Sequence, residues 1–202
     1  MNCEQAKLCY AIRDSLYLNI SNRCTLECQF CPKTKGNLQL HDYDLSLKRQ
    51  PSTEEVIAQL PNLAPFQEVV FCGYGEPTLR LKVLKQVAQH CKSLGISTRL
   101  NTDGLGNLVH KRNILPELAP CIDAISISLN AQSASVYEHH CQPKLNKAYD
   151  ALLDFIKLAS LYIRRVQVTA IDGLSEVDIA ECKQIAESSG ATFLARQLDV
   201  LG

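Results

Sequence analysis

The sequence predicts an α/β protein. Short β-rich runs alternate with amphipathic helical patterns, six such runs occur, and 46% of the 202 residues are hydrophobic, enough for a substantial core. Strands that alternate with helices pair in parallel through right-handed crossovers, and six such units give a partial barrel. We therefore expect residues 1–202 to form a single domain with a partial (β/α)6, TIM-like barrel.

The six strand candidates are short runs rich in β-branched and apolar residues, a composition and length typical of strands. They are Ser15–Ile20, Glu68–Cys72, Ile96–Leu100, Ala124–Leu129, Val166–Ile171 and Thr192–Ala195. In parallel α/β folds the active site forms at the carboxyl ends of the strands. The residues directly after each run are therefore the candidates for active-site residues.

Helical patterns fill the intervals between these runs. They cover Ser52–Leu60, Leu79–Leu94, Lys111–Leu118, Lys147–Leu161 and Ser175–Ser188. Ser52 precedes Glu55 by three residues, and Ser175 precedes Asp178 by three, which is the capping-box spacing of a helix start. The polar segment Lys33–Pro51 has no clear periodicity, and we expect it to be the longest loop.

Composition and charge exclude several classes of protein. The 21 basic residues balance the 21 acidic ones, so no overall field attracts nucleic acid or an anionic membrane. The first residues contain scattered charges and no long apolar stretch, which predicts neither a signal peptide nor a membrane span. We expect a cytoplasmic protein, whose ten cysteines serve as thiols or metal ligands.

Three cysteines follow the first predicted strand with the spacing C-x3-C-x2-C, namely Cys24, Cys28 and Cys31. Three thiolates on a four-iron cluster leave one iron open to bind a ligand. A closed structural zinc site normally needs four protein ligands, and no second pair with finger-like spacing follows. The spacing favours an iron-sulfur cluster, while buried thiols or a zinc site completed by a distant residue are the alternatives.

With Phe30 as the aromatic residue, the motif C-x3-C-x-aromatic-C resembles that of the radical S-adenosylmethionine (SAM) superfamily. The resemblance implies a [4Fe-4S] cluster held by the three cysteines and SAM bound at the open iron. It further implies reductive cleavage of SAM to a 5′-deoxyadenosyl radical, which abstracts hydrogen from a substrate. A reductant such as flavodoxin or ferredoxin would supply the electron.

The second predicted strand ends in Phe71-Cys72-Gly73-Tyr74-Gly75-Glu76-Pro77-Thr78, which resembles the Gly-Gly-Glu-Pro motif of the superfamily. Glycines let the backbone approach a ligand closely, and a carboxylate accepts hydrogen bonds from an ammonium group. The resemblance therefore assigns Gly73, Gly75 and Glu76 to the methionine part of SAM.

Two further strand ends contain polar motifs. Asn101-Thr102-Asp103-Gly104 is similar to a motif of glycyl-radical-activating members of the superfamily, which implies that Asn101 and Thr102 help to hold the methionine. After the fourth strand, alternation directs Ser128 and Asn130 to one side, where they align with residues that bind the ribose of SAM. Turn formation or strand-end capping is the alternative role for both pairs.

Nearly the whole chain resembles a family of short radical enzymes associated with TatD-type nucleases. The distinguishing features are the sequence Gly-Tyr-Gly-Glu-Pro-Thr, and a Ser-Leu-Asn-Ala turn followed by Tyr137 and by Cys141-Gln142-Pro143. This resemblance implies a functional link to such a nuclease and a nucleotide-derived substrate. Cys141, beside His139 and His140, is the candidate catalytic residue, as a hydrogen-atom donor or as a lining of the substrate pocket.

Three alternatives stay open at this point. One is an activating enzyme that installs a glycyl radical on a partner protein. Another is a relative of 7-carboxy-7-deazaguanine synthase, although Lys33 occupies the position where those enzymes place a magnesium-binding Thr or Ser, and Thr34 follows it. The third is a structural metal-binding module without enzymatic activity, in which the cysteines hold zinc.

Overall fold

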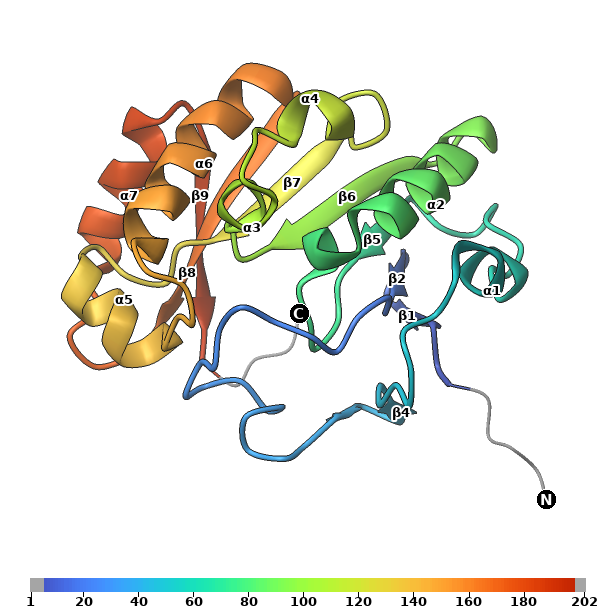
Figure 1. The fold of residues 1–202 in the computed structure, drawn as a ribbon, viewed down its shortest axis with the longest axis horizontal. Coiled ribbons are helices and arrows are strands. Elements are labelled where there is room, and N and C mark those ends of the chain that lie inside the picture. The colour runs from blue at the N-terminus through green and yellow to red at the C-terminus, as the bar shows by residue number, and fades with distance from the viewer. Residues whose placement is uncertain (1–5, 199–202) are drawn as a thin grey trace.

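The computed structural model describes residues 6–198, and its centre is a seven-stranded sheet with the order β1-β2-β5-β6-β7-β8-β9 (Figure 1). Its strands are β1 (Cys9–Ile12), β2 (Ser15–Leu18), β5 (Glu68–Phe71), β6 (Ser97–Thr102), β7 (Ala124–Ser128), β8 (Arg165–Asp172) and β9 (Thr192–Gln197). Within this sheet, β2, β5, β6, β7, β8 and β9 run parallel in the order of the sequence. This arrangement confirms the predicted α/β fold.

The first strand was not predicted. β1 pairs antiparallel with β2 through a tight turn in which Arg13 adopts a φ of 53°. A four-residue run directly before another strand gives no separate periodic pattern, so only the pairing identifies it as a strand. The parallel strands, in contrast, begin and end within two residues of the predicted runs.

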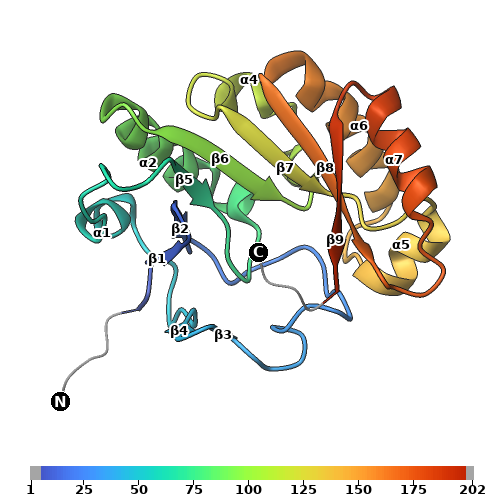
Figure 2. The same cartoon turned by 180° about the vertical axis from the view of Figure 1, so that it is seen from behind.

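Helices lie between the strands, at α1 (Thr53–Ala58), the 3-10 turn η1 (Pro77–Arg80), α2 (Leu81–Ser93), α3 (Gly106–His110), α4 (Leu115–Leu118), α5 (Ala134–Cys141), α6 (Ala148–Tyr162) and α7 (Ile179–Ser188). Figures 1 and 2 show α2, α4, α6 and α7 on the same face of the sheet. Within residues 6–198, none of these helices is long and apolar enough to cross a membrane.

The two faces of the sheet differ in polarity. The register places Phe71, Leu100 and Ile125 side by side, and all three are buried in the core beneath the helices. One residue further along, the register aligns polar side chains on the opposite face, in the row Asn101, Ser126, Gln167 and Thr192. The apolar face stabilises the fold, and the polar face is the concave side of the partial barrel.

Two predicted helical segments differ from the structure, and one helix of the structure was not predicted. The segment Lys111–Leu118 is not one helix, because α3 ends at His110, Lys111 after it adopts a left-handed conformation, and α4 begins only at Leu115. Helix α5 was not predicted at all. Helix α7 begins at Ile179 rather than at Ser175, because the Asp178 side chain accepts the N-terminal hydrogen bond from the Glu181 backbone N–H at 2.9 Å.

The segment after β2 crosses the carboxyl ends of the strands in Figure 1 and returns toward α1. The predicted loop Lys33–Pro51 contains a short hairpin of β3 (Gln39–Leu40) and β4 (Tyr43–Asp44). The Tyr74 hydroxyl donates to the Gln39 carbonyl oxygen at 2.9 Å. This bond fastens the hairpin to the glycine-rich loop after β5.

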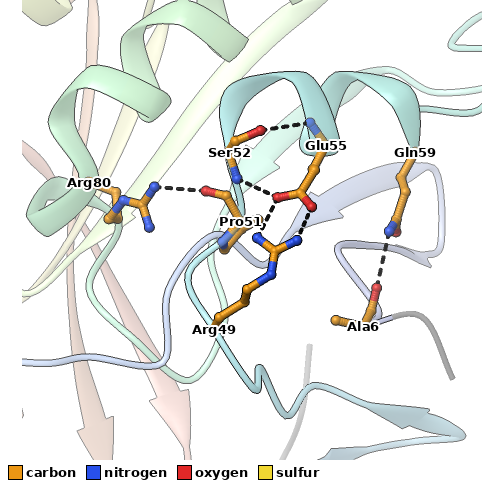
Figure 3. A network of polar contacts seen from close by, with 7 residues as sticks. All are labelled: Ala6, Arg49, Pro51, Ser52, Glu55, Gln59 and Arg80. Carbon is orange, nitrogen blue, oxygen red and sulfur yellow. Dashed lines mark hydrogen bonds and ion pairs between the residues drawn. The ribbon is translucent and has the colours of Figure 1, made fainter. Parts of the chain in front are cut away.

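The predicted capping box at Ser52 is present (Figure 3). Ser52 Oγ accepts from the Glu55 backbone N–H at 3.2 Å, and Glu55 Oε2 accepts from the Ser52 backbone N–H at 2.8 Å. Arg80 donates to the Pro51 carbonyl oxygen at 2.7 Å, just before the cap. Together these bonds fix the end of the long segment against α1 and α2.

The substitution Ser52→Ala is expected to lower the free energy of unfolding by about 1 kcal/mol, because an N-terminal backbone donor of α1 loses its acceptor. Urea denaturation of the full chain measures the change. Ser93→Ala, on the exposed last turn of α2, is the matched control. An unchanged unfolding midpoint in Ser52→Ala would contradict a stabilising role for this capping box.

Candidate functional site

The cysteine loop lies at the carboxyl ends of the strands, directly after β2. Cys24, Cys28 and Cys31 line a cavity of about 320 Å³, and Gly73 and Gly75 form part of its wall. The remaining lining residues are Leu26, Glu27, Lys33, Thr34, Tyr74 and Lys144. Among residues 6–198, no three His, Cys, Asp or Glu side chains come close enough together to hold a single metal ion.

The glycine-rich loop after β5 holds one side of the cysteine loop. The Glu76 backbone N–H donates to the Arg23 carbonyl oxygen at 2.7 Å. A Cβ atom at Gly75 would lie 2.8 Å from that same oxygen and closer still to the Ser21 carbonyl oxygen. Gly73 adopts a φ of 145°, a conformation that side chains rarely permit. Gly75 is therefore needed for close backbone contact within the protein, and Gly73 for the conformation of its own backbone.

The end of α5 holds the other side of the cysteine loop. The Gln29 backbone N–H donates to the His140 carbonyl oxygen at 2.9 Å, and the Glu27 backbone N–H donates to the Cys141 carbonyl oxygen at 3.1 Å. The resulting contact extends into an isolated antiparallel bridge between Leu26 and Pro143. Helix α5, which the sequence did not reveal, is thus part of the framework of the site.

Glu76 is buried and its carboxylate is occupied by donors from the protein. Its Oε1 accepts from the Thr78 backbone N–H at 2.9 Å, from Thr78 Oγ1 at 2.6 Å and from Thr102 Oγ1 at 2.8 Å. Its Oε2 accepts from the Asp103 backbone N–H at 2.7 Å. The bonds from Thr102 and Asp103 tie the loop after β5 to the residues after β6, and the two from Thr78 fix the segment around Glu76 itself.

Asp103 extends this network to the cysteine loop. Its Oδ2 accepts from the Thr25 hydroxyl and lies 3.9 Å from Cys24 Sγ, while its Oδ1 accepts from the Leu105 backbone N–H at 2.9 Å. Burial raises the pKa of Asp103, and burial together with the nearby Asp103 charge raises the pKa of Glu76. Burial of the two carboxyls so close together therefore disfavours the charged form of each.

The raised pKa values of Cys24 and Cys28 favour the protonated thiols when no metal is bound. Contact with the Cys141 thiol and burial raise the pKa of Cys28, and burial with the nearby Asp103 raises the pKa of Cys24. Metal binding to these thiols must therefore release protons. The donor set of three thiols in one cavity fits an iron-sulfur cluster.

The predicted site residues at the carboxyl ends of β6 and β7 do not line this cavity, and their settings differ. Asn101 is half-buried on the concave face and accepts from Arg99 at 2.9 Å, whereas the Thr102 side chain points to Glu76. Ser128 is half-buried at the end of β7. Asn130 departs from the predicted alternation, because it adopts a φ of 59° after the strand has ended, and its Nδ2 lies 4.0 Å from Cys141 Sγ.

Phe30 and Cys141 differ in exposure. Phe30 is partly buried and packs against the main core, next to the cysteine loop. Cys141 is fully buried, so its thiol faces the interior instead of an open pocket. Its predicted role as a hydrogen-atom donor stays a prediction, although its position next to Cys28 indicates contact with the cysteine loop.

Sequence reasoning missed Thr25 and Asp103, which connect the cysteine loop to the loop after β6. Both lie inside recognised motifs, but the bond between them joins residues 78 positions apart. A pairing over that distance leaves no periodic pattern in the sequence. The available signals were Thr25, a short polar residue next to the first cysteine, and Asp103, an acidic residue in the motif after β6.

Residues 18–188 match the family described as the Radical SAM superfamily. The chain is 26% identical over 151 residues to an uncharacterised protein of Methanocaldococcus jannaschii, covering 74% of this chain and 44% of that protein. It is 35% identical over 91 residues to the tungsten-containing aldehyde ferredoxin oxidoreductase cofactor-modifying protein of Pyrococcus furiosus, covering 41% and 23% respectively. The chain therefore spans less than half the length of either relative.

Solved structures show the same fold. TYW1 with a lysine-pyruvate adduct bound matches with a TM-score of 0.65 and 15% identity, over 100% of this chain and 70% of that one. Streptococcus suis SuiB bound to the precursor peptide SuiA matches with a TM-score of 0.68 and 17% identity, over 95% and 40%. With its sequence match, its fold and its cysteine loop, the chain belongs to the radical SAM superfamily, whose cofactors are a [4Fe-4S] cluster and S-adenosylmethionine.

Proposed function

We propose that this chain is a radical SAM enzyme in which Cys24, Cys28 and Cys31 hold the [4Fe-4S] cluster. The observation that carries the proposal is the single cavity that these thiols line, with Gly73 and Gly75 in its wall at the carboxyl ends of the strands. When bound, the cluster and SAM supply reductive cleavage to a 5′-deoxyadenosyl radical that abstracts hydrogen from a substrate. The residues of the chain bind, orient and enclose these groups.

Backbone groups and a few side chains orient SAM in this proposal. Gly73 and Gly75 present backbone to the cavity, and the buried carboxylate of Glu76 acts by fixing that loop rather than by contacting SAM. Asn101 and Ser128 face the concave side, where they are available to the polar parts of the cofactor. Phe30, Thr102 and Asn130 shape the surrounding loops.

The concave face supports a polar substrate. The aligned row Asn101, Ser126, Gln167 and Thr192 offers amide and hydroxyl groups across neighbouring strands. A nucleotide-derived substrate and a functional link to a TatD-type nuclease are the finer parts of the proposal, and they rest on the resemblance of the motifs. They are consistent with a polar face of this kind.

The reductant in this proposal is a flavodoxin or a ferredoxin in the cytoplasm. Lys33 and Lys144 line the cavity beside the cysteines, and Lys35 is exposed next to them. Glu27 also lines the cavity and pairs with Lys144 at 2.8 Å. A basic rim favours encounter with an acidic electron carrier, because complementary charge speeds association.

Metal content tests the proposal against a structural zinc module. Protein reconstituted anaerobically with iron and sulfide is expected to be brown and to hold about four irons per chain. Iron, sulfide and zinc analysis of the same sample gives the answer. A colourless chain that takes up one zinc and no iron would overturn the proposal.

A further inference from the structure

A second cavity lies at the opposite end of the sheet from the cysteine loop, where β6, β7 and β8 begin. It has a volume of about 510 Å³, which is within the range of ligand sites. The active site of a parallel α/β fold forms at the carboxyl ends of the strands, so the proposed radical chemistry does not account for this cavity. The polar residues that line it are Lys92, Ser97, Asp123, Arg164 and Arg165.

Hydrogen bonds fix the charged groups around this basic cavity. Asp123 Oδ1 accepts from Lys92 Nζ at 2.6 Å, and Asp123 Oδ2 accepts from the Thr98 backbone N–H at 2.9 Å. The Ser97 hydroxyl donates to Asp123 Oδ2 at 3.4 Å and accepts from Arg165 Nη2 at 3.2 Å. Asp123, the acid in the lining, is therefore occupied by groups of the protein, whereas the partner of Arg165 is a neutral hydroxyl.

The lining carries more positive than negative charge. Asp123 balances Lys92, but no carboxylate within residues 6–198 forms an ion pair with Arg164 or Arg165. Glu68, at the start of β5, already pairs with another arginine at 2.7 Å. Two arginines without a carboxylate partner at one cavity favour an anion as the ligand. A guanidinium group matches phosphate especially well, because it can donate two parallel hydrogen bonds to it.

An apolar cavity adjoins the basic one. It has a volume of about 690 Å³, and Gly95, Ile96 and Ser97 line both cavities. Its wall includes Leu94, which is 58% exposed, and the half-buried Phe66. A Cβ atom at Gly95 would meet no other atom within 4 Å, so the surface between the two cavities is open. An anionic group and an apolar group of one ligand can therefore be bound side by side.

We propose that the two cavities form one binding site for an organic phosphate. The phosphate group binds at Arg164 and Arg165, and an apolar or aromatic body lies against Leu94 and Phe66. Such a ligand gains both charge pairing and burial of apolar surface, whereas an inorganic anion gains only the first. The inference goes beyond the proposed function and does not depend on it, because the site lies at the other end of the strands.

A solvated surface and a nucleic-acid site are the competing explanations. Nucleic-acid sites are extended basic surfaces, whereas this chain has 21 basic and 21 acidic residues and its basic cavity adjoins an apolar one. A solvated surface would show no preference between an inorganic and an aromatic phosphate. The relative affinities for two probes therefore separate the three explanations.

Isothermal titration calorimetry of the full chain with phenyl phosphate and with inorganic phosphate tests the proposal. Phenyl phosphate is expected to bind about threefold more tightly or better, because its ring buries apolar surface. Arg164→Met and Arg165→Met, made separately, should each weaken the binding of both probes by about tenfold, because each removes a charged donor. Leu94→Ser should weaken the binding of phenyl phosphate alone.

Matched controls lie outside both cavities. Arg196→Met removes an exposed arginine of β9, and Leu161→Ser removes a leucine that is 77% exposed, so both variants should bind the two probes as wild type does. Thermal unfolding midpoints close to that of wild type show that the variants are folded.

Three results would overturn the proposal. One is the absence of measurable phenyl phosphate binding, and another is equal affinity of the wild-type chain for the two probes. The third is wild-type binding in both arginine variants. If a single-stranded oligonucleotide binds while phenyl phosphate does not, the arginines belong to a nucleic-acid site instead.

Discussion

Cys28→Ala is expected to abolish cluster binding and SAM cleavage. Cys28 is the central cysteine of the loop, it lines the cavity, and the loop offers no other thiol in its place. Loss of a residue that only orients a ligand already weakens metal sites by about 10-fold to 100-fold, so loss of a ligand should cost about 100-fold or more. Iron analysis after reconstitution and the yield of 5′-deoxyadenosine measure the two effects.

Cys182→Ala controls for the general effect of removing a buried thiol. Cys182 is fully buried in α7, away from the cysteine loop, so its loss should leave iron content and cleavage close to wild type. Wild-type iron content in Cys28→Ala would contradict the assignment of Cys28 as a ligand. The neighbouring thiol of Cys141 would then be the first candidate to have replaced it.

Glu76→Ala is expected to lower the free energy of unfolding of the cluster-free chain by about 3 kcal/mol or more. The substitution removes the common acceptor of the Thr78 N–H, the Thr78 and Thr102 hydroxyls and the Asp103 N–H. Each buried donor left without a partner costs about 1–3 kcal/mol. Urea denaturation at neutral pH measures the loss.

Two variants sharpen this result. Glu76→Gln keeps one acceptor oxygen, so its free energy of unfolding should lie between those of wild type and Glu76→Ala. Glu138→Ala, at an exposed position of α5, should change stability by no more than about 0.5 kcal/mol. Wild-type stability in Glu76→Ala, combined with weakened SAM binding, would show instead that the carboxylate serves the cofactor, as the sequence motif suggests.

The sequence predicts the parallel strands well, because each is a separate β-rich run between helical patterns. It misses α5, whose residues Ala134–Cys141 include serine and histidine and form no strong apolar stripe. That helix is held by packing on α6 and by backbone bonds to the cysteine loop, both of which are long-range. The start of α7 is misplaced because two possible caps, Ser175 and Asp178, stand three residues apart.

The site, like the fold, has features that the sequence predicts and features that it does not. Spacing alone predicts Cys24, Cys28 and Cys31 as the ligands, because ligands from one short loop leave a local pattern in the sequence. The contacts that hold the cysteine loop cannot be predicted from a local pattern, because they join residues far apart in the sequence. They link Thr25 to Asp103 and the end of α5 to the cysteine loop. Glu76 shows the difference most clearly, because its motif suggests a ligand contact while its four hydrogen bonds all come from the protein.

Reductive cleavage of SAM by the reconstituted wild-type chain tests the central claim most directly. After anaerobic reduction, the loaded protein is expected to release 5′-deoxyadenosine and methionine, and neither product should form without reductant or in Cys28→Ala. A protein that holds about four irons, binds SAM and yields no 5′-deoxyadenosine under reduction would contradict the claim that this chain performs radical chemistry.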